Sequence, residues 1–208
     1  MLDWATISSL ATAGGTLVLA VATFASVRSS NRSARLAERS LLVGMRPVLG
    51  PSRLQDDPQK VGFFDSHWLV VPGGCGAAEA TDEAVYLAIA VRNVGTGIAV
   101  LHGWALHLDS APNPPFPKVD AFHQLTRDIY VAPGDVGFWQ GALRDPGTDE
   151  FAATRRLVEH PETFAVDVLY GDQNGGQRSI TRYRLVPAHD RWLATVGRIW
   201  HVDGPQAR

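Results

Sequence analysis

The segment Val85-Tyr86-Leu87-Ala88-Ile89-Ala90-Val91-Arg92 is the clearest β-strand in this sequence of 208 residues. It is rich in β-branched and aromatic residues and holds neither glycine nor proline, as is typical of strands. Asn93-Val94-Gly95-Thr96-Gly97 follows directly, and asparagine and glycine favour turns. Residues 98–108 resume the strand pattern. This region therefore predicts a strand, a turn and a second strand.

Much of the remaining chain repeats this alternation of strand-forming runs and turns. The turn Ala132-Pro133-Gly134-Asp135 predicts that residues 136–143 form a hairpin with the strand that ends at Val131. One helix is predicted shortly before Pro161, because acidic residues precede and basic residues follow in that segment. Seven to nine short strands in all predict a mainly-β domain, either a β-sandwich or a small barrel. The other predicted strands are 48–54, 61–71, 164–170, 178–186 and 192–202.

The turn Asn93-x-Gly95-x-Gly97-x-Ala99 resembles the B-to-C region of bacterial immunoglobulin-like, adhesion-type domains. Ala132-Pro133-Gly134-Asp135 and Tyr170-Gly171-Asp172 are similar to the E and F strands of that family, so the resemblance covers residues 84–186. It implies an immunoglobulin-like β-sandwich over residues 47–208 and no particular ligand. The whole chain also resembles single-pass proteins of unknown function from high-GC bacteria, because arginine outnumbers lysine 17 to 2.

The N-terminal stretch Trp4 to Val27 holds 24 consecutive residues without a charge. As a helix with a rise of about 1.5 Å per residue it is roughly 36 Å long, enough to cross a hydrocarbon core of about 30 Å. The stretch is only moderately apolar, because alanine, serine, threonine and glycine are frequent in it. It predicts a single transmembrane helix over residues 1–27.

The flanks of this stretch predict its orientation. Arginines follow it and none precedes it, and flanks rich in lysine and arginine stay cytoplasmic. We therefore expect an inner-membrane protein with its N-terminus outside and its C-terminal domain in the cytoplasm. The single cysteine, Cys75, agrees with a reducing compartment. Ala20-Val21-Ala22 resembles a signal-peptide cleavage site, so a cleaved or reversed N-terminus stays open as an alternative.

A basic segment, residues 28–46, follows the apolar stretch and is expected to continue the helix to about Gly44. Its arginines form one stripe, because they recur at i, i+4, i+7 and i+11. They either attract anionic lipid headgroups, at about 1 kcal/mol each, or only fix the topology. Residues 47–208 hold 14 basic and 19 acidic side chains, a net charge of −5. The stripe consists of Arg28, Arg32, Arg35 and Arg39.

Small residues recur every four positions within the apolar stretch, at Ser8, Thr12, Thr16 and Ala20. Side chains at that spacing share one helix face and allow a second helix to approach closely. They are a hypothetical packing face for a second copy or another membrane helix.

No motif for catalysis or cofactor binding is present. The seven histidines lack the spacing of a helical zinc site, and no paired cysteines, nucleophile elbow or phosphate-binding glycine loop occurs. We predict no catalytic residue, no metal and no cofactor. Asp172-Gln173-Asn174-Gly175 is interpreted as a turn and not a calcium loop. The net charge of −2 does not favour nucleic-acid binding.

The tryptophans allow two interpretations. Trp4 is expected at the membrane interface, and those on the predicted strands are expected to fill the core. The alternative hypothesis is that Trp139 and Trp200 form an exposed aromatic platform for a partner.

Taken together, these features predict a membrane-anchored, non-catalytic interaction or scaffold module. Its β-domain would bind an unidentified protein through loops or a strand edge. Two alternatives are an envelope-facing receptor or adhesion-type domain of opposite topology, and a metal-dependent enzyme.

Overall fold

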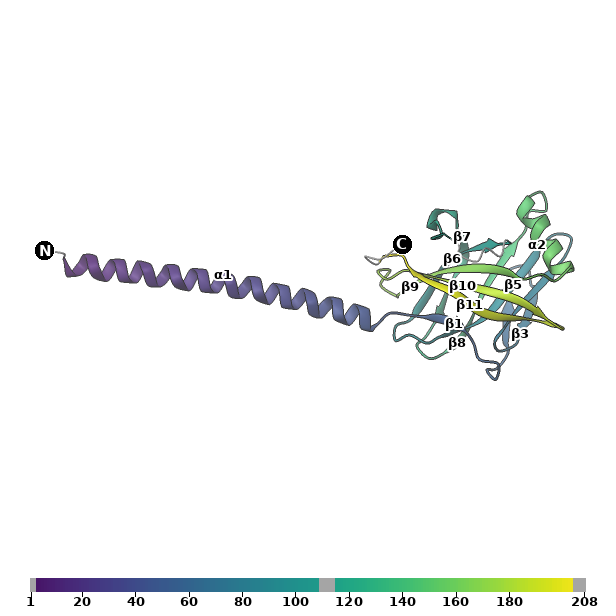
Figure 1. The fold of residues 1–208 in the computed structure, drawn as a ribbon, viewed down its shortest axis with the longest axis horizontal. Coiled ribbons are helices and arrows are strands. Elements are labelled where there is room, and N and C mark those ends of the chain that lie inside the picture. Colours follow the sequence, from purple (N-terminus) through teal and green to yellow (C-terminus); the bar gives the residue numbers. More distant parts are fainter. Residues whose placement is uncertain (1–2, 109–114, 204–208) are drawn as a thin grey trace. The chain divides into compact units, whose positions relative to one another are not determined.

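The computed structural model describes residues 3–108 and 115–203, except for the side chains of residues 5–7, 10, 11, 39, 42 and 43. The chain divides into two compact units, Met1–Gly44 and Met45–Arg208. The first consists of helix α1, and the second, called the β-unit below, holds every described strand (Figure 1).

Helix α1 runs without interruption from Trp4 to Gly44. The predicted helix end at Gly44 is confirmed. Glycine at a helix end and a proline shortly after it, here Pro47, stop further helical bonding. The described side chains of α1 are exposed, large apolar ones such as Leu17 and Phe24 included.

In the described part of the chain, no helix is both long and apolar enough to cross a membrane. The prediction of a transmembrane helix over residues 1–27 therefore has no support among the described residues. The physical reason lies in the composition, since small or polar residues such as Thr12, Gly14, Gly15 and Thr16 lie among the apolar ones.

The β-unit is a curled antiparallel sheet of nine strands with one added hairpin. The order in the sheet is β1-β5-β4-β11-β10-β9-β6-β7, β8 pairs with β5, and β2 and β3 pair with each other. The mainly-β prediction is confirmed, and the immunoglobulin-like arrangement is not. The strands are β1 (Leu49–Pro51), β2 (Gln59–Gly62), β3 (Trp68–Val71), β4 (Cys75–Ala80), β5 (Val85–Asn93), β6 (Ala99–His107), β7 (His123–Val131), β8 (Val136–Leu143), β9 (Phe164–Gly171), β10 (Ser179–Ala188) and β11 (Arg191–His201), with a 3₁₀ turn at Val119–Ala121 and helix α2 at Asp149–Glu159.

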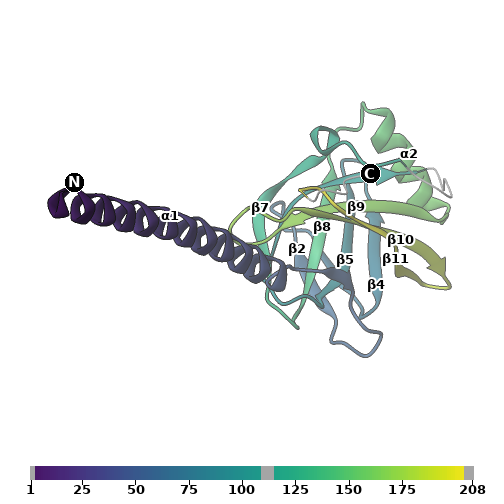
Figure 2. The same ribbon diagram turned by 60° about the vertical axis from the view of Figure 1, so that its left-hand side comes forward.

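Strand β8 does not pair with β7, so the predicted 129–143 hairpin is wrong. The turn itself is present, because the Asp135 N–H donates to the Ala132 carbonyl at 3.1 Å and Gly134 has a φ of +80°. Strand β8 instead pairs along β5, from Val85 opposite Leu143 to Arg92 opposite Val136. Strands β7 and β8 are the two end strands of the sheet, each paired on one side within the described residues, and they lie next to each other (Figure 2).

Asn93 holds the turn at residues 132–135 against the end of β5. The Asn93 backbone accepts from the Gly134 N–H at 2.8 Å and donates to the Asp135 carbonyl at 3.1 Å. Its buried side chain donates to the carbonyls of Gly97 at 2.7 Å and Val131 at 3.0 Å. One asparagine thus joins the end of β5, the turn that follows it and the end of β7.

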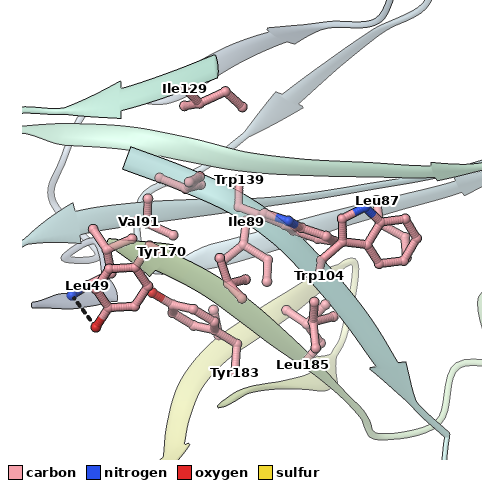
Figure 3. Close-up of a cluster of buried hydrophobic side chains, with 14 of the residues drawn as sticks. Leu49, Leu87, Ile89, Val91, Trp104, Ile129, Trp139, Tyr170, Tyr183 and Leu185 are labelled. Carbon is pink, nitrogen blue, oxygen red and sulfur yellow. Dashed lines mark hydrogen bonds between the residues drawn. The ribbon is translucent and has the colours of Figure 1, made fainter. Parts of the chain in front are cut away.

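The main core lies inside the curl (Figure 3). It includes Trp139, whose ring meets Trp104 edge-on with 5.5 Å between ring centroids. Tyr170 reaches across the core, and its hydroxyl accepts from the Leu49 N–H at 3.2 Å (Figure 3). Strand β5 is buried on both faces, because its odd-numbered residues enter this core and its even-numbered ones enter a second cluster. A continuous apolar run is what such a strand requires.

Strands β4 and β11 meet across only two residue pairs, Gly76 opposite Trp192 and Cys75 opposite Leu193. Cys75 is fully buried there. Burial raises the pKa of its thiol above the ordinary value.

Candidate functional site: a groove between the hairpin, β7 and β8

The β2–β3 hairpin covers the outer face of β5. Its apolar residues Val61, Phe63 and Leu69 are buried in the second cluster together with Tyr86 and neighbouring alanines of β5. The Phe63 and Tyr86 rings meet edge-on at 4.8 Å between centroids. Because even-numbered residues of β5 point outward, a second apolar layer must cover them, and the hairpin supplies it.

Asp65, in the turn of the hairpin, ties it to the sheet. Its carboxylate accepts from the Tyr86 hydroxyl at 2.7 Å and from Arg144 Nη2 at 3.2 Å. Burial opposes ionisation, but the hydrogen bonds from Tyr86, the His67 N–H and Arg144 lower the pKa of Asp65 below its usual value. The hairpin is therefore held in place at its tip as well as by its apolar face.

A groove lies between this hairpin and strands β7 and β8. It has two parts of about 190 Å³ and about 430 Å³, and Phe63, Phe64, Thr126, Arg127 and Gln140 line both. The smaller part is also lined by Trp104, His123, Gln124, Leu125, Gly141, Ala142 and Arg144, and the larger part by Lys60, Gly62, Trp68 and Phe138.

Arg127 crosses the groove between its two parts. From β7, its Nη2 donates to Gln140 Oε1 on β8 at 2.6 Å and to the Gly62 carbonyl of the hairpin at 3.2 Å. Its guanidinium also lies 5.6 Å from the centre of the Phe138 ring. Both of its hydrogen-bond acceptors are neutral, so no carboxylate compensates the charge of Arg127 through these bonds.

The groove is basic, although residues 47–208 carry a net charge of −5. As far as the structure describes the chain, its lining includes Lys60, Arg127 and Arg144 and no aspartate or glutamate. Lys60 Nζ lies 4.8 Å above the Trp68 ring, and the Arg144 guanidinium lies 4.3 Å above the Phe64 ring. Cationic groups over aromatic faces are stabilised by the ring quadrupole.

The strands that border the groove have unused backbone edges. Strand β8 pairs only with β5, and β7 only with β6, among the described residues. Between the pairs Leu101–Ile129 and Gly103–Gln124, residues 125–128 of β7 pair with no strand. Such edges are available for pairing with another chain.

The predicted aromatic platform is wrong, because both of its residues are buried. Trp139 is 0% exposed and Trp200 5%. Trp139 is on the inner face of β8, and Arg182 packs over the Trp200 ring at 5.2 Å. The exposed aromatic residues of the β-unit instead include Phe64, at 78%, Tyr130, at 61%, and Trp68, at 56%.

The sequence contains a signal for the exposure of Phe64, namely the pair Phe63-Phe64 beside an Asp-Ser turn. Adjacent residues of an extended segment point to opposite faces, so two consecutive phenylalanines cannot both enter one core. Phe63 is buried and Phe64 is exposed.

The predicted residues of the basic stripe and the packing face lie on α1. The described side chains of Arg28, Arg32 and Arg35 are exposed, and the side chain of Arg39 lies outside the described residues. Ser8, Thr12, Thr16 and Ala20 are exposed on one face of α1, where they line a shallow hollow.

Other polar groups of the β-unit serve its structure. Asp172 Oδ1 accepts from the Asn174 and Gly176 N–H groups at 3.1 and 2.9 Å, which confirms the predicted turn. Within residues 3–108 and 115–203, no group of three or more His, Cys, Asp or Glu side chains is placed to hold a metal ion.

In comparisons with protein-family models, curated proteins and solved structures, nothing matches this chain.

Proposed function

We propose that this chain is a membrane-anchored, non-catalytic interaction module whose groove binds a partner protein. The observation that carries this proposal is the groove itself, a basic, aromatic-rimmed surface bordered by unpaired strand edges. Tryptophan and arginine are the residues most enriched at the energetic centres of protein interfaces. Immunoglobulin-like domains, which residues 84–186 resemble, bind through such loops and strand edges.

The rim of the groove is held rigidly before any partner arrives. Gly62 allows the Trp68 ring to lie on the hairpin backbone, since a Cβ at Gly62 would come within 2.7 Å of that ring. The guanidinium of Arg144 packs over the Phe64 ring and is itself bonded to Asp65. Rings ordered in advance lose little conformational entropy on binding.

A photocrosslinking experiment tests the interaction. With benzoylphenylalanine in place of Phe64, we expect illuminated cells to yield a discrete adduct of the full chain with one protein. The same probe at Val94, which is also strongly exposed but does not line the groove, should yield none. Trp68→Ala should abolish the adduct at position 64. An adduct that survives Trp68→Ala, or that forms equally from Val94, would contradict a partner in the groove.

The anchoring part of the proposal is supported by α1. The stretch 4–27 is free of charge over its whole length, including Ile7 and Leu10, whose side chains lie outside the described residues. The hydroxyls of Thr12, Thr16 and Thr23 donate to the carbonyls four residues earlier at 2.8–2.9 Å. Hydroxyls bonded to their own helix suit an apolar environment.

Flotation of the full chain with membranes tests the anchor. We expect the native chain to float, and the double variant Val18→Arg with Val21→Arg to remain behind. Each central arginine costs about 2.5–3.5 kcal/mol of insertion free energy. The control, Val70→Arg with Val94→Arg, replaces two valines that are equally exposed in the β-unit and should float normally. A native chain that does not float would refute the anchor.

We further propose that the N-terminus lies outside the inner membrane and the β-unit in the cytoplasm, with the arginine stripe beside anionic headgroups. Ser8, Thr12, Thr16 and Ala20 would then form a packing face for a second copy. Native Cys75 is buried and cannot report topology, so we suggest Gln173→Cys in a Cys75→Ala chain, because Gln173 is exposed. An impermeant maleimide should label it only after lysis. Labelling in intact cells would establish the envelope-facing alternative.

A further inference from the structure

Building on the function proposed above, we infer that the occupant of the groove is an extended, acidic segment of the partner protein, lying along β8. Shape, backbone edges and charge each support this assignment.

The floor of the groove has the geometry of a strand. Phe138, Gln140, Ala142 and Arg144 follow one another at alternate positions of β8 and of the residue after it, and all four line the groove. At about 3.3 Å per residue, residues 138–144 span about 20 Å. An extended segment of about six residues matches that length. The groove consists of two small parts, both lined by Arg127, and parts of this size suit single side chains better than a helix about 10–12 Å wide.

The borders of the groove offer main-chain partners to such a segment. The outer edge of β8 and residues 125–128 of β7 form no strand pairing within the described residues. A peptide that adds to a sheet edge obtains affinity from main-chain hydrogen bonds, and pockets for alternate side chains give specificity.

The charge of the groove selects acidic side chains. Among the described residues, the lining holds Lys60, Arg127 and Arg144 and no carboxylate, and of these three Arg144 is already paired with Asp65 beside the groove. Within the part of the chain that the structure describes, Arg127 is hydrogen-bonded only to the Gln140 amide oxygen and a backbone carbonyl. A carboxylate is a stronger acceptor for a guanidinium than either neutral oxygen, so an acidic side chain can take over these bonds.

The same charges do not favour a nucleic acid. Asp65 is bonded to Arg144, and Glu150 Oε2 lies 3.1 Å from Nε2 of His123, which lines the same part of the groove as Arg144. The net charge of −5 over residues 47–208 also disfavours binding of a long polyanion by the β-unit. A short acidic segment carries fewer charges beyond the groove and avoids most of this repulsion.

Fluorescence anisotropy with three labelled octapeptides tests the inference on the full chain in detergent. Valine alternates with glutamate, glutamine or lysine in these peptides. We expect the glutamate peptide to bind at least about tenfold more tightly than the glutamine peptide, the lysine peptide not to bind, and affinity to fall with added salt. Arg127→Gln should weaken the glutamate peptide at least about tenfold. Lys118→Gln, an exposed lysine outside the groove, should leave its affinity unchanged.

Lys60→Gln provides a second test that does not depend on the bonds of Arg127, because Lys60 is exposed and lies over Trp68. It should also weaken the glutamate peptide. Equal binding of the three peptides would overturn the charge assignment. Tighter binding of a single-stranded oligonucleotide than of the glutamate peptide would assign the groove to nucleic acid. If no octapeptide binds while the adduct at position 64 still forms, the extended-peptide inference fails and the interaction module stands.

Discussion

Trp139→Ala is expected to lower the free energy of unfolding by about 3–5 kcal/mol, as is usual when a buried tryptophan is truncated. Trp139 is fully buried, packs edge-on against Trp104 and belongs to the main core. Removing the indole leaves a cavity that the close neighbouring strands can fill only in part. Because domains are stable by only about 5–15 kcal/mol, this loss is a large share of the total.

Trp68→Ala is the matched control, because Trp68 is exposed on the hairpin. It should change the unfolding free energy by no more than about 0.5 kcal/mol. Urea unfolding of the full chain, followed by circular dichroism, measures both variants. Equal, small effects of the two substitutions would show that Trp139 is not a core residue.

Arg182→Met is expected to cost about 3–5 kcal/mol, because it breaks a buried ion pair and leaves one charge behind. Arg182 Nε and Nη2 donate to the two oxygens of Asp167, both at 2.6 Å. Asp167 is completely buried, and its other described side-chain partner is His107, with Nε2 2.8 Å from Oδ2. Without Arg182, the buried carboxylate keeps the His107 ring nitrogen as its one described side-chain partner.

The double variant Asp167→Leu with Arg182→Met separates this cost from lost packing. Replacing both partners by apolar residues removes the orphaned charge, so the double variant should recover most of the lost stability. The same urea experiment gives both values. A double variant that is less stable than Arg182→Met alone would show that packing of these side chains, including Arg182 over Trp200, dominates.

The positions of strands could be predicted from the sequence, but their pairing could not. Residues 136–143 form a strand as predicted, and the turn at 132–135 is present. Local turn chemistry fixes where the chain reverses, yet the partner of β8 depends on the edge of β5, more than forty residues earlier. Such non-local pairing leaves no short-range sequence signal.

The groove was harder to predict, because it depends on which face of each strand is buried. Trp139 and Trp68 both lie on predicted strands, and composition alone does not separate them. Arg127 and Lys60 are isolated basic residues in the sequence, and only the curl of the sheet brings them to one surface. The arginine stripe, in contrast, could be predicted, because its residues recur at helical spacing within one continuous segment of the sequence.

The narrow contact between β4 and β11 has a consequence for the behaviour of the folded chain. Only two residue pairs join these strands, and one of them contains Cys75, the chain's single cysteine, which is fully buried. We expect a fluctuation that separates these two strands to expose Cys75. The rate at which a thiol reagent modifies Cys75 in the native protein therefore reports how often β4 and β11 separate. The native sequence allows this measurement without an added label.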